Sequence, residues 1–213
     1  MAAITCIPAI EHMDELLEQC QLHNYTKKST IISTGEYSES LFFILEGSVT
    51  VLLEEKPNKQ IIISYLNKGN FFGELGLFNR HSEHLRSAKV SAKTACQIAE
   101  ISYIKFHTLA LQYPELLYAV YSQMADCLRN TTRKVANLAF IDVAGRVART
   151  LLNLSQHPDA MTHPDGMQIK ISRQEIGRIV GCSREMAGRV LKSLEEQGLI
   201  EAKGQTIVVF GTR

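Results

Sequence analysis

Residues 172–196 carry side chains that could read the edges of DNA bases. Arg184, Glu185 and Arg189 fall within this segment at helical spacing. An arginine can donate two hydrogen bonds to O6 and N7 of guanine, and a glutamate can accept one from N4 of cytosine. A charged helix face by itself is more often only a solvated surface. The interpretation therefore depends on whether the neighbouring sequence builds the elements that present such a face to DNA.

The neighbouring residues predict two short helices joined by a tight turn. Ser172, with Glu175 three positions later, is typical of a helix N-cap, and Ser183 can cap the second helix. Gly181 supplies the left-handed conformation that the turn needs. Apolar residues of the second helix recur at helical spacing and are expected to face inward: Met186, Val190, Leu191 and Leu194. This is the arrangement of a helix-turn-helix, whose second helix enters the major groove.

Positive charge is concentrated on the same segment, although the whole chain has a net charge of only +1. Between Lys170 and Lys192, six basic residues stand against two acidic ones. Such a surplus favours the phosphate backbone of DNA. The residues expected to contact DNA are Ser172, Arg173, Gln174, Ser183, Arg184, Glu185, Gly188, Arg189, Lys192 and Lys203.

A second stretch, residues 71–78, combines features of an anion site with those of a sugar site. Gly73 lets the backbone approach a ligand closely, and N–H groups at the start of a short helix favour an anion. Arg86 can hold a phosphate through its bidentate fork. Glu74 would instead accept a hydrogen bond from a sugar hydroxyl. Together these residues indicate a ribose phosphate, although the glycines alone could be turns and Arg86 alone a surface charge.

Three segments position these two sites. From about Thr26 to Ser102, short β-type runs separated by Gly35, Gly47 and Gly69 predict a β-roll or jelly-roll barrel. A short amphipathic helix is expected before it, over residues 9–20. A long helix is expected over residues 114–140.

The third segment predicts a winged helix. We expect a helix from the N-cap Asp142 to Leu154, a loop over 156–166, a strand over 168–171, the helix pair, and a hairpin of residues 199–202 and 206–210. The fold class is therefore α+β. Its parts are a nucleotide-binding β-roll over 1–113, a dimerisation helix and hinge over 114–140, and a DNA-binding domain over 141–213.

The long helix carries apolar residues in alternating steps of four and three. These seam residues are Leu117, Tyr121, Met124, Leu128, Val135 and Leu138, with Thr131 in the same frame. A strict seam of this kind predicts a coiled coil, most simply a homodimer. The alternative is an intramolecular core helix, and some additional apolar positions indicate that the helix also contacts the barrel. Thr131 and Thr132 place hydroxyls at the seam, which usually means that they set the register or contact something.

Composition excludes several other classes of protein. Hydrophobic residues make up 45% of the chain and charged residues 21%, as in an ordinary globular protein. We expect no signal peptide and no membrane span. The five cysteines are scattered, which favours free thiols in a reducing cytoplasm. His81 and His84 flank Glu83 but are expected to be solvated, so no metal is assigned. No hydrolase or P-loop motif is present, which argues against an enzyme.

The sequence resembles the cyclic AMP receptor (catabolite activator) family of bacteria, which joins a cyclic-nucleotide-binding β-roll to a winged helix. The resemblance depends on Gly-Glu-Leu-Gly-Leu-Phe at 73–78, Arg-Ser-Ala at 86–88 and runs through nearly the whole C-terminal half. These later runs lie at 137–140, 158–170, 173–177, 181–185 and 206–213.

The resemblance implies that cyclic AMP binds in the β-roll as an allosteric effector. Its phosphate would lie on Arg86, Ser87 and the backbone near Gly73, and its ribose on Glu74. Thr131, and Thr132 of the partner subunit, would bind the adenine amino group. The implied ligand set is Gly73, Glu74, Leu75, Arg86, Ser87, Thr131 and Thr132.

The resemblance also implies a homodimeric activator that binds a two-fold-symmetric promoter site, like TGTGA and its inverse, and contacts RNA polymerase. One polymerase surface would comprise Thr162, His163, Asp165 and Gly166, and a second His23, Glu100 and Lys105. Gln21 stands where a His is expected, which weakens the second inference.

Other effectors remain alternatives, because relatives sense cyclic di-GMP, haem-bound carbon monoxide, or oxygen through an iron–sulfur cluster. A cluster needs several N-terminal cysteines, and only Cys6 and Cys20 occur there. DNA binding without any effector is also an alternative. The residues Glu74, Arg86-Ser87 and Thr131-Thr132 favour cyclic AMP.

Overall fold

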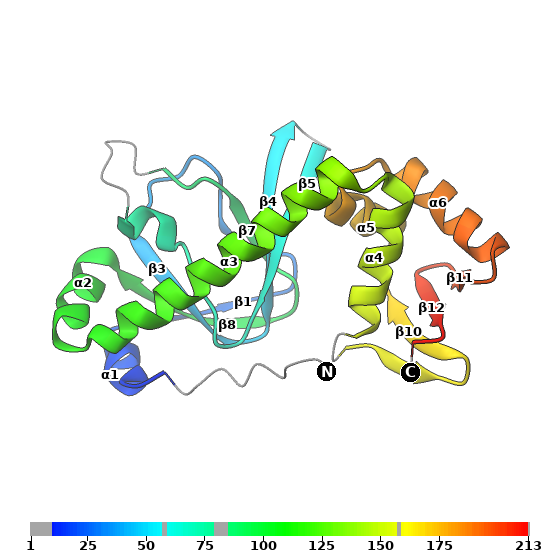
Figure 1. The fold of residues 1–213 in the computed structure, drawn as a ribbon. Helices are drawn as coiled ribbons and strands as arrows, with labels where there is room; N and C mark the ends of the chain where they lie inside the picture. The colour runs from blue at the N-terminus through cyan, green and yellow to red at the C-terminus, as the bar shows by residue number, and fades with distance from the viewer. Residues whose placement is uncertain (1–9, 57–58, 79–84, 157–158, 213) are drawn as a thin grey trace. The chain divides into compact units, whose positions relative to one another are not determined.

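The computed structural model describes residues 10–56, 59–78, 85–156 and 159–212. The chain forms two compact units, Met1–Asn130 and Thr131–Arg213. The boundary between them falls within the long helix α3 (Pro114–Phe140), which begins and ends where the sequence predicts (Figure 1).

Two four-stranded antiparallel sheets form the β-roll that was expected in the first unit. One sheet has the order β1-β8-β3-β6: Gln21–Tyr25, Cys96–Ser102, Ser40–Glu46 and Phe71–Phe72. The other has the order β2-β7-β4-β5: Thr30–Ile32, Lys89–Ala92, Ser48–Lys56 and Lys59–Asn67. Gly35, Gly47 and Gly69 all adopt positive φ, so the predicted turns form where the chain reverses.

Strand β3 is buried on both faces because two cores lie on either side of it. Leu41 and Phe43 pack with residues of the helices, while Phe42 and Ile44 pack with residues of the second sheet. This alternation follows from the two-residue period of a strand. The helices are α1 (Met13–Glu18), α2 (Tyr103–Gln112) and α3, with a short 3₁₀ helix η1 (Glu74–Phe78) after β6.

Helix α1 is shorter than the helix predicted over residues 9–20. Its N-cap, His12, has a left-handed conformation with φ 63°, and its side chain makes no capping hydrogen bond. A helix cannot extend backward through such a residue, so α1 starts at Met13.

The second unit is a winged helix, as expected. It contains α4 (Val143–Ser155), β9 (Met161–His163), β10 (Gly166–Lys170), α5 (Arg173–Val180), α6 (Arg184–Glu196), β11 (Ile200–Lys203) and β12 (Thr206–Phe210). The sheet order is β11-β12-β10-β9, and the core contains Val147, Leu151, Ile176 and Leu191. Strand β9 corrects the prediction of an unbroken loop, because Met161 to His163 pair with Gln168 to Gly166 across a turn.

No helix among the described residues is long and apolar enough to cross a membrane.

Candidate functional site

The Arg86 side chain lies inside the first unit without an ion-pair partner among the described residues. Only 9% of the residue is exposed. Nη1 donates to Gly73 O and to Tyr103 Oη, each at 3.1 Å, and Nη2 donates to Ser40 O at 2.8 Å. These bonds use three of the five guanidinium N–H donors. The Nε donor and one Nη2 donor remain, on neighbouring nitrogens, as a bidentate contact with a phosphate requires.

The surrounding structure fixes this guanidinium in place. Arg86 N donates to Glu36 O at 2.8 Å, and Gly35 N donates to Arg86 O at 2.9 Å, so the turn at residues 35–36 holds its backbone. The Cζ atom lies 5.4 Å from the centre of the Phe42 ring, within cation–π range. No carboxylate among the described residues forms an ion pair with this buried cation, although Glu74 and Glu36 interact with it electrostatically, and the arrangement therefore favours binding of an anion.

Gly73 and Glu74 lie directly beside Arg86. Gly73 has φ +82°, and a Cβ atom there would lie 2.7 Å from Arg86 Nη1, so only glycine allows this close approach. Glu74 begins η1 and is half-buried. Burial raises its pKa above the usual carboxyl value, while its backbone hydrogen bond and the charge of Arg86 oppose this effect. A buried cation and a hydrogen-bond acceptor therefore lie side by side, as expected of a ribose phosphate site, while the binding of a ligand here stays a prediction.

Sequence reasoning missed a hydroxyl network that completes this site. Tyr103 Oη donates to Gly73 O at 2.5 Å and lies 2.6 Å from Ser38 Oγ. Burial raises the pKa of Tyr103, which keeps the hydroxyl protonated. A side chain at Gly76 would overlap Ser38 Oγ and Tyr103 Oη, so that glycine is required by packing. Tyr103 is brought to Arg86 by the pairing of β3 with β8, and no local motif signals it.

The remaining ligand residues implied by the resemblance lie in different settings. Leu75 and Ser87 are exposed. Thr131 is half-buried and Thr132 exposed on α3 in the second unit, so their contact with a nucleotide stays a prediction.

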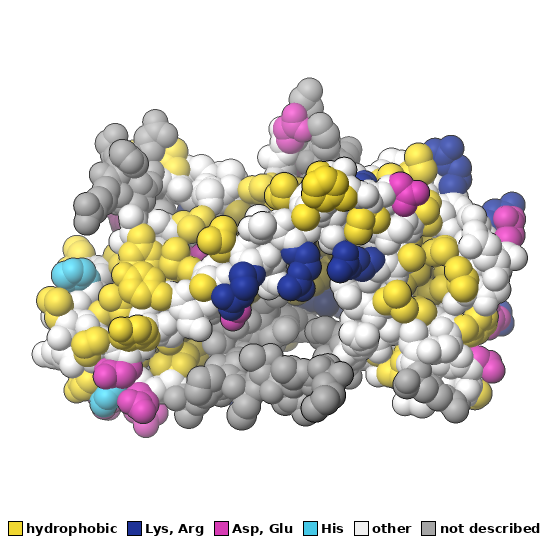
Figure 2. Space-filling view, in the orientation of Figure 1, with side chains coloured by type: hydrophobic (Ala, Val, Ile, Leu, Met, Phe, Trp, Pro, Cys, Tyr) yellow, Lys and Arg dark blue, Asp and Glu magenta, His cyan; other side chains and the backbone are white. Residues whose placement is uncertain are grey.

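The predicted seam is largely exposed in the single chain. Tyr121, Leu128, Val135 and Leu138 are exposed, with 68% of Leu128 accessible to solvent, whereas Leu117 and Met124 pack partly against the β-roll core. Hydrophobic side chains follow α3 in the space-filling view (Figure 2). The helix also contacts the β-roll through the buried Leu116 and Val120, which confirms a core face, while pairing of the exposed seam with a second chain stays a prediction.

The helix-turn-helix forms through the predicted caps. Ser172 Oγ accepts from Glu175 N, and Ser183 Oγ accepts from Met186 N, each at 3.1 Å. Gly181 has φ 76° and ψ 45°, the left-handed conformation of a helix C-terminus. The turn between α5 and α6 is therefore built as the sequence indicates.

Most of the predicted DNA-reading side chains are exposed. Arg173, Gln174, Ser183, Arg184, Glu185 and Arg189 are exposed, and Ser172 and Gly188 are half-buried. Lys192 forms an ion pair with Glu196 at 3.8 Å, and Lys203 one with Glu201 at 2.5 Å. The charge of Lys203 is thus partly neutralised within the wing.

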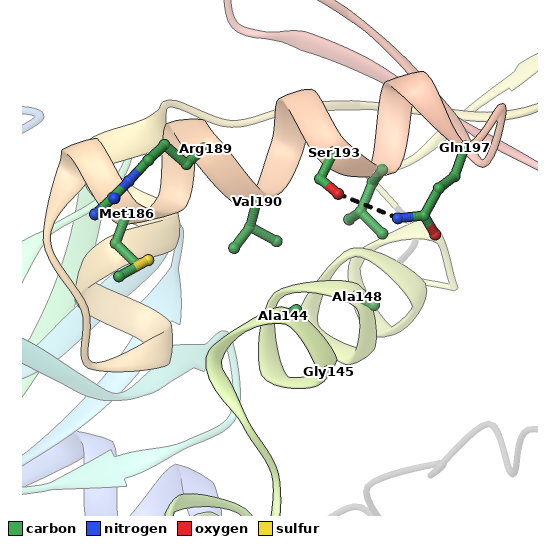
Figure 3. Close-up of a pocket in the computed structure, with 9 residues that line it drawn as sticks. Ala144, Gly145, Ala148, Met186, Arg189, Val190, Ser193 and Gln197 are labelled. Carbon is green, nitrogen blue, oxygen red and sulfur yellow. Dashed lines mark hydrogen bonds between the residues drawn. The ribbon is translucent and has the colours of Figure 1, made fainter.

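One part of the α6 prediction needs correction. Leu191 and Leu194 are buried as expected and Val190 packs partly against the core, but Met186 is only half-buried, and Ala187 takes a fully buried position. Met186 and Val190 line a shallow groove opposite Ala144, Gly145 and Ala148 of α4 (Figure 3). The small residues of α4 leave this groove open because they cannot fill it.

The proposed polymerase-contacting residues lie at two surfaces of separate units. Thr162 and Asp165 are exposed around the β9–β10 turn, His163 is half-buried, and Gly166 is buried against the backbone of Val209. In the first unit, His23 Nε2 lies 2.9 Å from Glu100 Oε2 across β1 and β8, and Lys105 is exposed on α2. The exposure of these residues does not test whether either surface contacts a partner, so both contacts stay predictions.

No cluster of metal-ligating side chains occurs among the described residues. His81, Glu83 and His84 lie outside them. Cys20, Cys96, Cys127 and Cys182 are free thiols, and burial raises the pKa of Cys20 to about 11.

Comparisons with known proteins identify a domain of known type in each part of the chain. Residues 22–113 match the cyclic nucleotide-binding domain, and residues 145–210 match the Crp-like helix-turn-helix domain. The sequence is 65% identical, over 100% of both chains, to the cAMP-activated global transcriptional regulator Vfr of Pseudomonas aeruginosa. It is 59% identical to the cAMP-activated global transcriptional regulator CRP of Salmonella typhimurium, over 94% of this chain and 95% of that one.

A solved structure of the c-di-GMP responsive global regulator CLP from Xanthomonas campestris is also similar. The TM-score is 0.88 and the identity 40%, covering 93% of this chain and 98% of that one.

Proposed function

The chain belongs to the CRP family of DNA-binding transcription regulators, and from this premise we propose that it is a homodimeric activator switched on by cyclic AMP. The family is not enzymatic, which agrees with the lack of hydrolase motifs in the sequence.

The buried Arg86 guanidinium carries this proposal. It is held by three hydrogen bonds, has no ion-pair partner among the described residues, and keeps two donors on neighbouring nitrogens. A cyclic phosphate supplies one negative charge and two free oxygens, which matches both needs. Gly73 leaves room for the ligand, and Glu74 would accept from the ribose hydroxyl. Ser87, Thr131 and Thr132 would complete the site on the phosphate and the adenine.

Cyclic di-GMP is the second candidate effector, because the structurally similar regulator from Xanthomonas campestris is described as responsive to it. Cyclic AMP is favoured by higher identity to regulators described as cAMP-activated, 65% and 59% against 40%. A single buried guanidinium also suits one phosphate better than two.

The exposed face of α3 supports the homodimer, since monomers rarely expose a contiguous apolar stripe of this length. Two copies related by a two-fold axis would present two α6 helices to a palindromic site, with Arg184, Glu185 and Arg189 reading bases. Phosphate contacts would come from Arg173, Gln174, Ser183 and Lys192, and from Lys203 in the wing. We propose RNA polymerase as the partner for the two exposed surfaces, and the cytoplasm, where DNA and polymerase meet, as the location.

Calorimetry with cyclic AMP, cyclic GMP and cyclic di-GMP, run beside DNA mobility shifts, tests the proposal. The DNA would carry TGTGA and its inverse, with a scrambled duplex as control. We expect cyclic AMP to bind and to raise the affinity of the protein for the palindromic duplex but not for the scrambled one. Equal DNA affinity with and without every nucleotide would overturn the proposal, and a response to cyclic di-GMP alone would replace the effector.

A further inference from the structure

Gln123 is a polar residue on the face of α3 that packs against the β-roll. It follows Leu116 and Val120 at steps of four and three, so the three side chains share one face of the helix. Leu116 is 0% and Val120 1% exposed, and Gln123 is half-buried. A glutamine at the third position of a buried stripe needs hydrogen-bond partners, and none of the seam or ligand residues supplies them.

Its partners are both backbone groups of one residue, Phe71. Phe71 N donates to Gln123 Oε1 at 2.7 Å, and Gln123 Nε2 donates to Phe71 O at 2.5 Å. Among the described strands, β6 lies at the edge of its sheet and pairs with β3 alone, so no described strand lies beside its outer backbone groups. The amide of Gln123 therefore takes the place of a neighbouring strand and fastens α3 to β6.

These two hydrogen bonds between Gln123 and Phe71, called the clamp from here on, lie close to the predicted nucleotide site along the chain. Phe71 is two residues before Gly73, whose carbonyl oxygen accepts from both Arg86 and Tyr103. Gly73 and Glu74 would therefore move together with β6 if a nucleotide repositioned them. Because Phe71 is 1% exposed and fixed in the core, β6 cannot shift without moving the amide of Gln123 or breaking its bonds.

We propose that Gln123 is a positioning residue that transmits nucleotide binding from the Gly73–Glu74 cradle to α3 through the backbone of Phe71. This route lies within one subunit and within the first unit of the fold. It differs from the contact of Thr131 and Thr132 with the ligand, because it needs no direct contact between helix and nucleotide. The inference rests on the proposed function, since it requires that a nucleotide binds at the cradle.

The test is the coupling between nucleotide and DNA, measured in the full-length protein. DNA affinity is measured with and without saturating cyclic AMP, and the ratio of the two affinities is the coupling factor. Gln123→Met keeps the length of the side chain and removes both hydrogen bonds. Gln123→Glu keeps the acceptor for Phe71 N–H and loses the donor to Phe71 O. Gln112→Met, at an exposed position at the end of α2, makes the same substitution without a clamp.

We expect Gln123→Met to reduce the coupling factor by about fivefold or more, with Gln123→Glu in between and Gln112→Met like the wild type. A merely structural role would lower the thermal midpoint and leave the coupling factor unchanged, and that result would overturn the inference. If Gln123→Met does not fold, Gln123→Glu decides by the same criterion.

Hydrogen exchange of the wild-type protein provides a measurement that needs no variant. Cyclic AMP should slow exchange in the peptides that contain Phe71 and Gln123 to a similar extent. Protection of the first peptide without the second would contradict the route through Gln123. A wild-type protein that binds no nucleotide would instead overturn the proposed function itself, so the two failures are distinguishable.

Discussion

The variant Arg86→Met tests whether the buried guanidinium of Arg86 binds an anion. Methionine keeps an unbranched apolar stem near the Phe42 ring and removes the charge. Two opposing contributions then change in the unliganded protein. Three hydrogen bonds from a charged donor, each contributing about 1.5–3 kcal/mol, are lost. The desolvation cost of a buried ion, several kcal/mol, disappears as well. We therefore expect the free energy of unfolding without ligand to change by less than about 2 kcal/mol.

The response of this variant to ligand should change much more. A ligand present at 100 times its Kd stabilises the folded state by about 2.7 kcal/mol. The wild-type protein should show this gain with cyclic AMP in thermal and denaturant unfolding, with the Kd fixed by calorimetry. Arg86→Met should show none, because both phosphate donors and the compensating charge are gone.

Lys68→Met is the matched control, because it removes one exposed positive charge from the same unit. It should keep the full gain. The reasoning is refuted if Arg86→Met retains a gain above about 1 kcal/mol at the same ligand concentration. It is also refuted if this variant is unfolded without ligand while Lys68→Met is folded, since the guanidinium would then be a structural requirement.

Three further predictions concern the hydroxyl network, the seam and the DNA-reading face. Tyr103→Phe should weaken cyclic AMP binding by roughly tenfold, because one hydrogen bond to the Arg86 guanidinium is lost; unchanged calorimetric affinity would exclude this role. Leu128→Glu should shift the protein to monomers in analytical ultracentrifugation, since it places like charges at an exposed seam position, and a stable dimer would contradict the seam. Arg189→Ala should cost about 1–3 kcal/mol on the palindrome and relax preference at one G·C pair. Equal losses on palindromic and random DNA would show that Arg189 contacts only phosphates.

The features that the sequence predicted well are those set by neighbours along the chain. Ser172, Ser183 and Asp142 each cap a helix through a backbone N–H three residues later. Gly181 forms the left-handed turn through its own conformational freedom. Because each of these interactions closes within a few residues, spacing and residue type were enough to locate them.

The features that the sequence did not predict depend on distant partners. Tyr103 reaches Arg86 across 17 positions, and Gln123 reaches Phe71 across 52. Strand β9 forms because Met161–His163 finds β10 across a turn, although its own residues give a weak strand pattern. Such contacts are set by strand order and register, which a single sequence does not reveal.

The spacing of apolar residues along helix α3 is compatible with two interpretations. The sequence of the helix has a narrow seam typical of a coiled coil and enough additional apolar residues for a core helix. The structure assigns these to different faces: Leu116 and Val120 are buried on the β-roll, while Leu128 and Val135 remain exposed. Gln123 lies on the first face, bonded to the strand that leads into the nucleotide cradle. The same helix is therefore bonded to β6 on one face and exposes an apolar seam on another. Under the proposal, a displacement at the Gly73–Glu74 cradle would reach the seam where a second copy is proposed to dock.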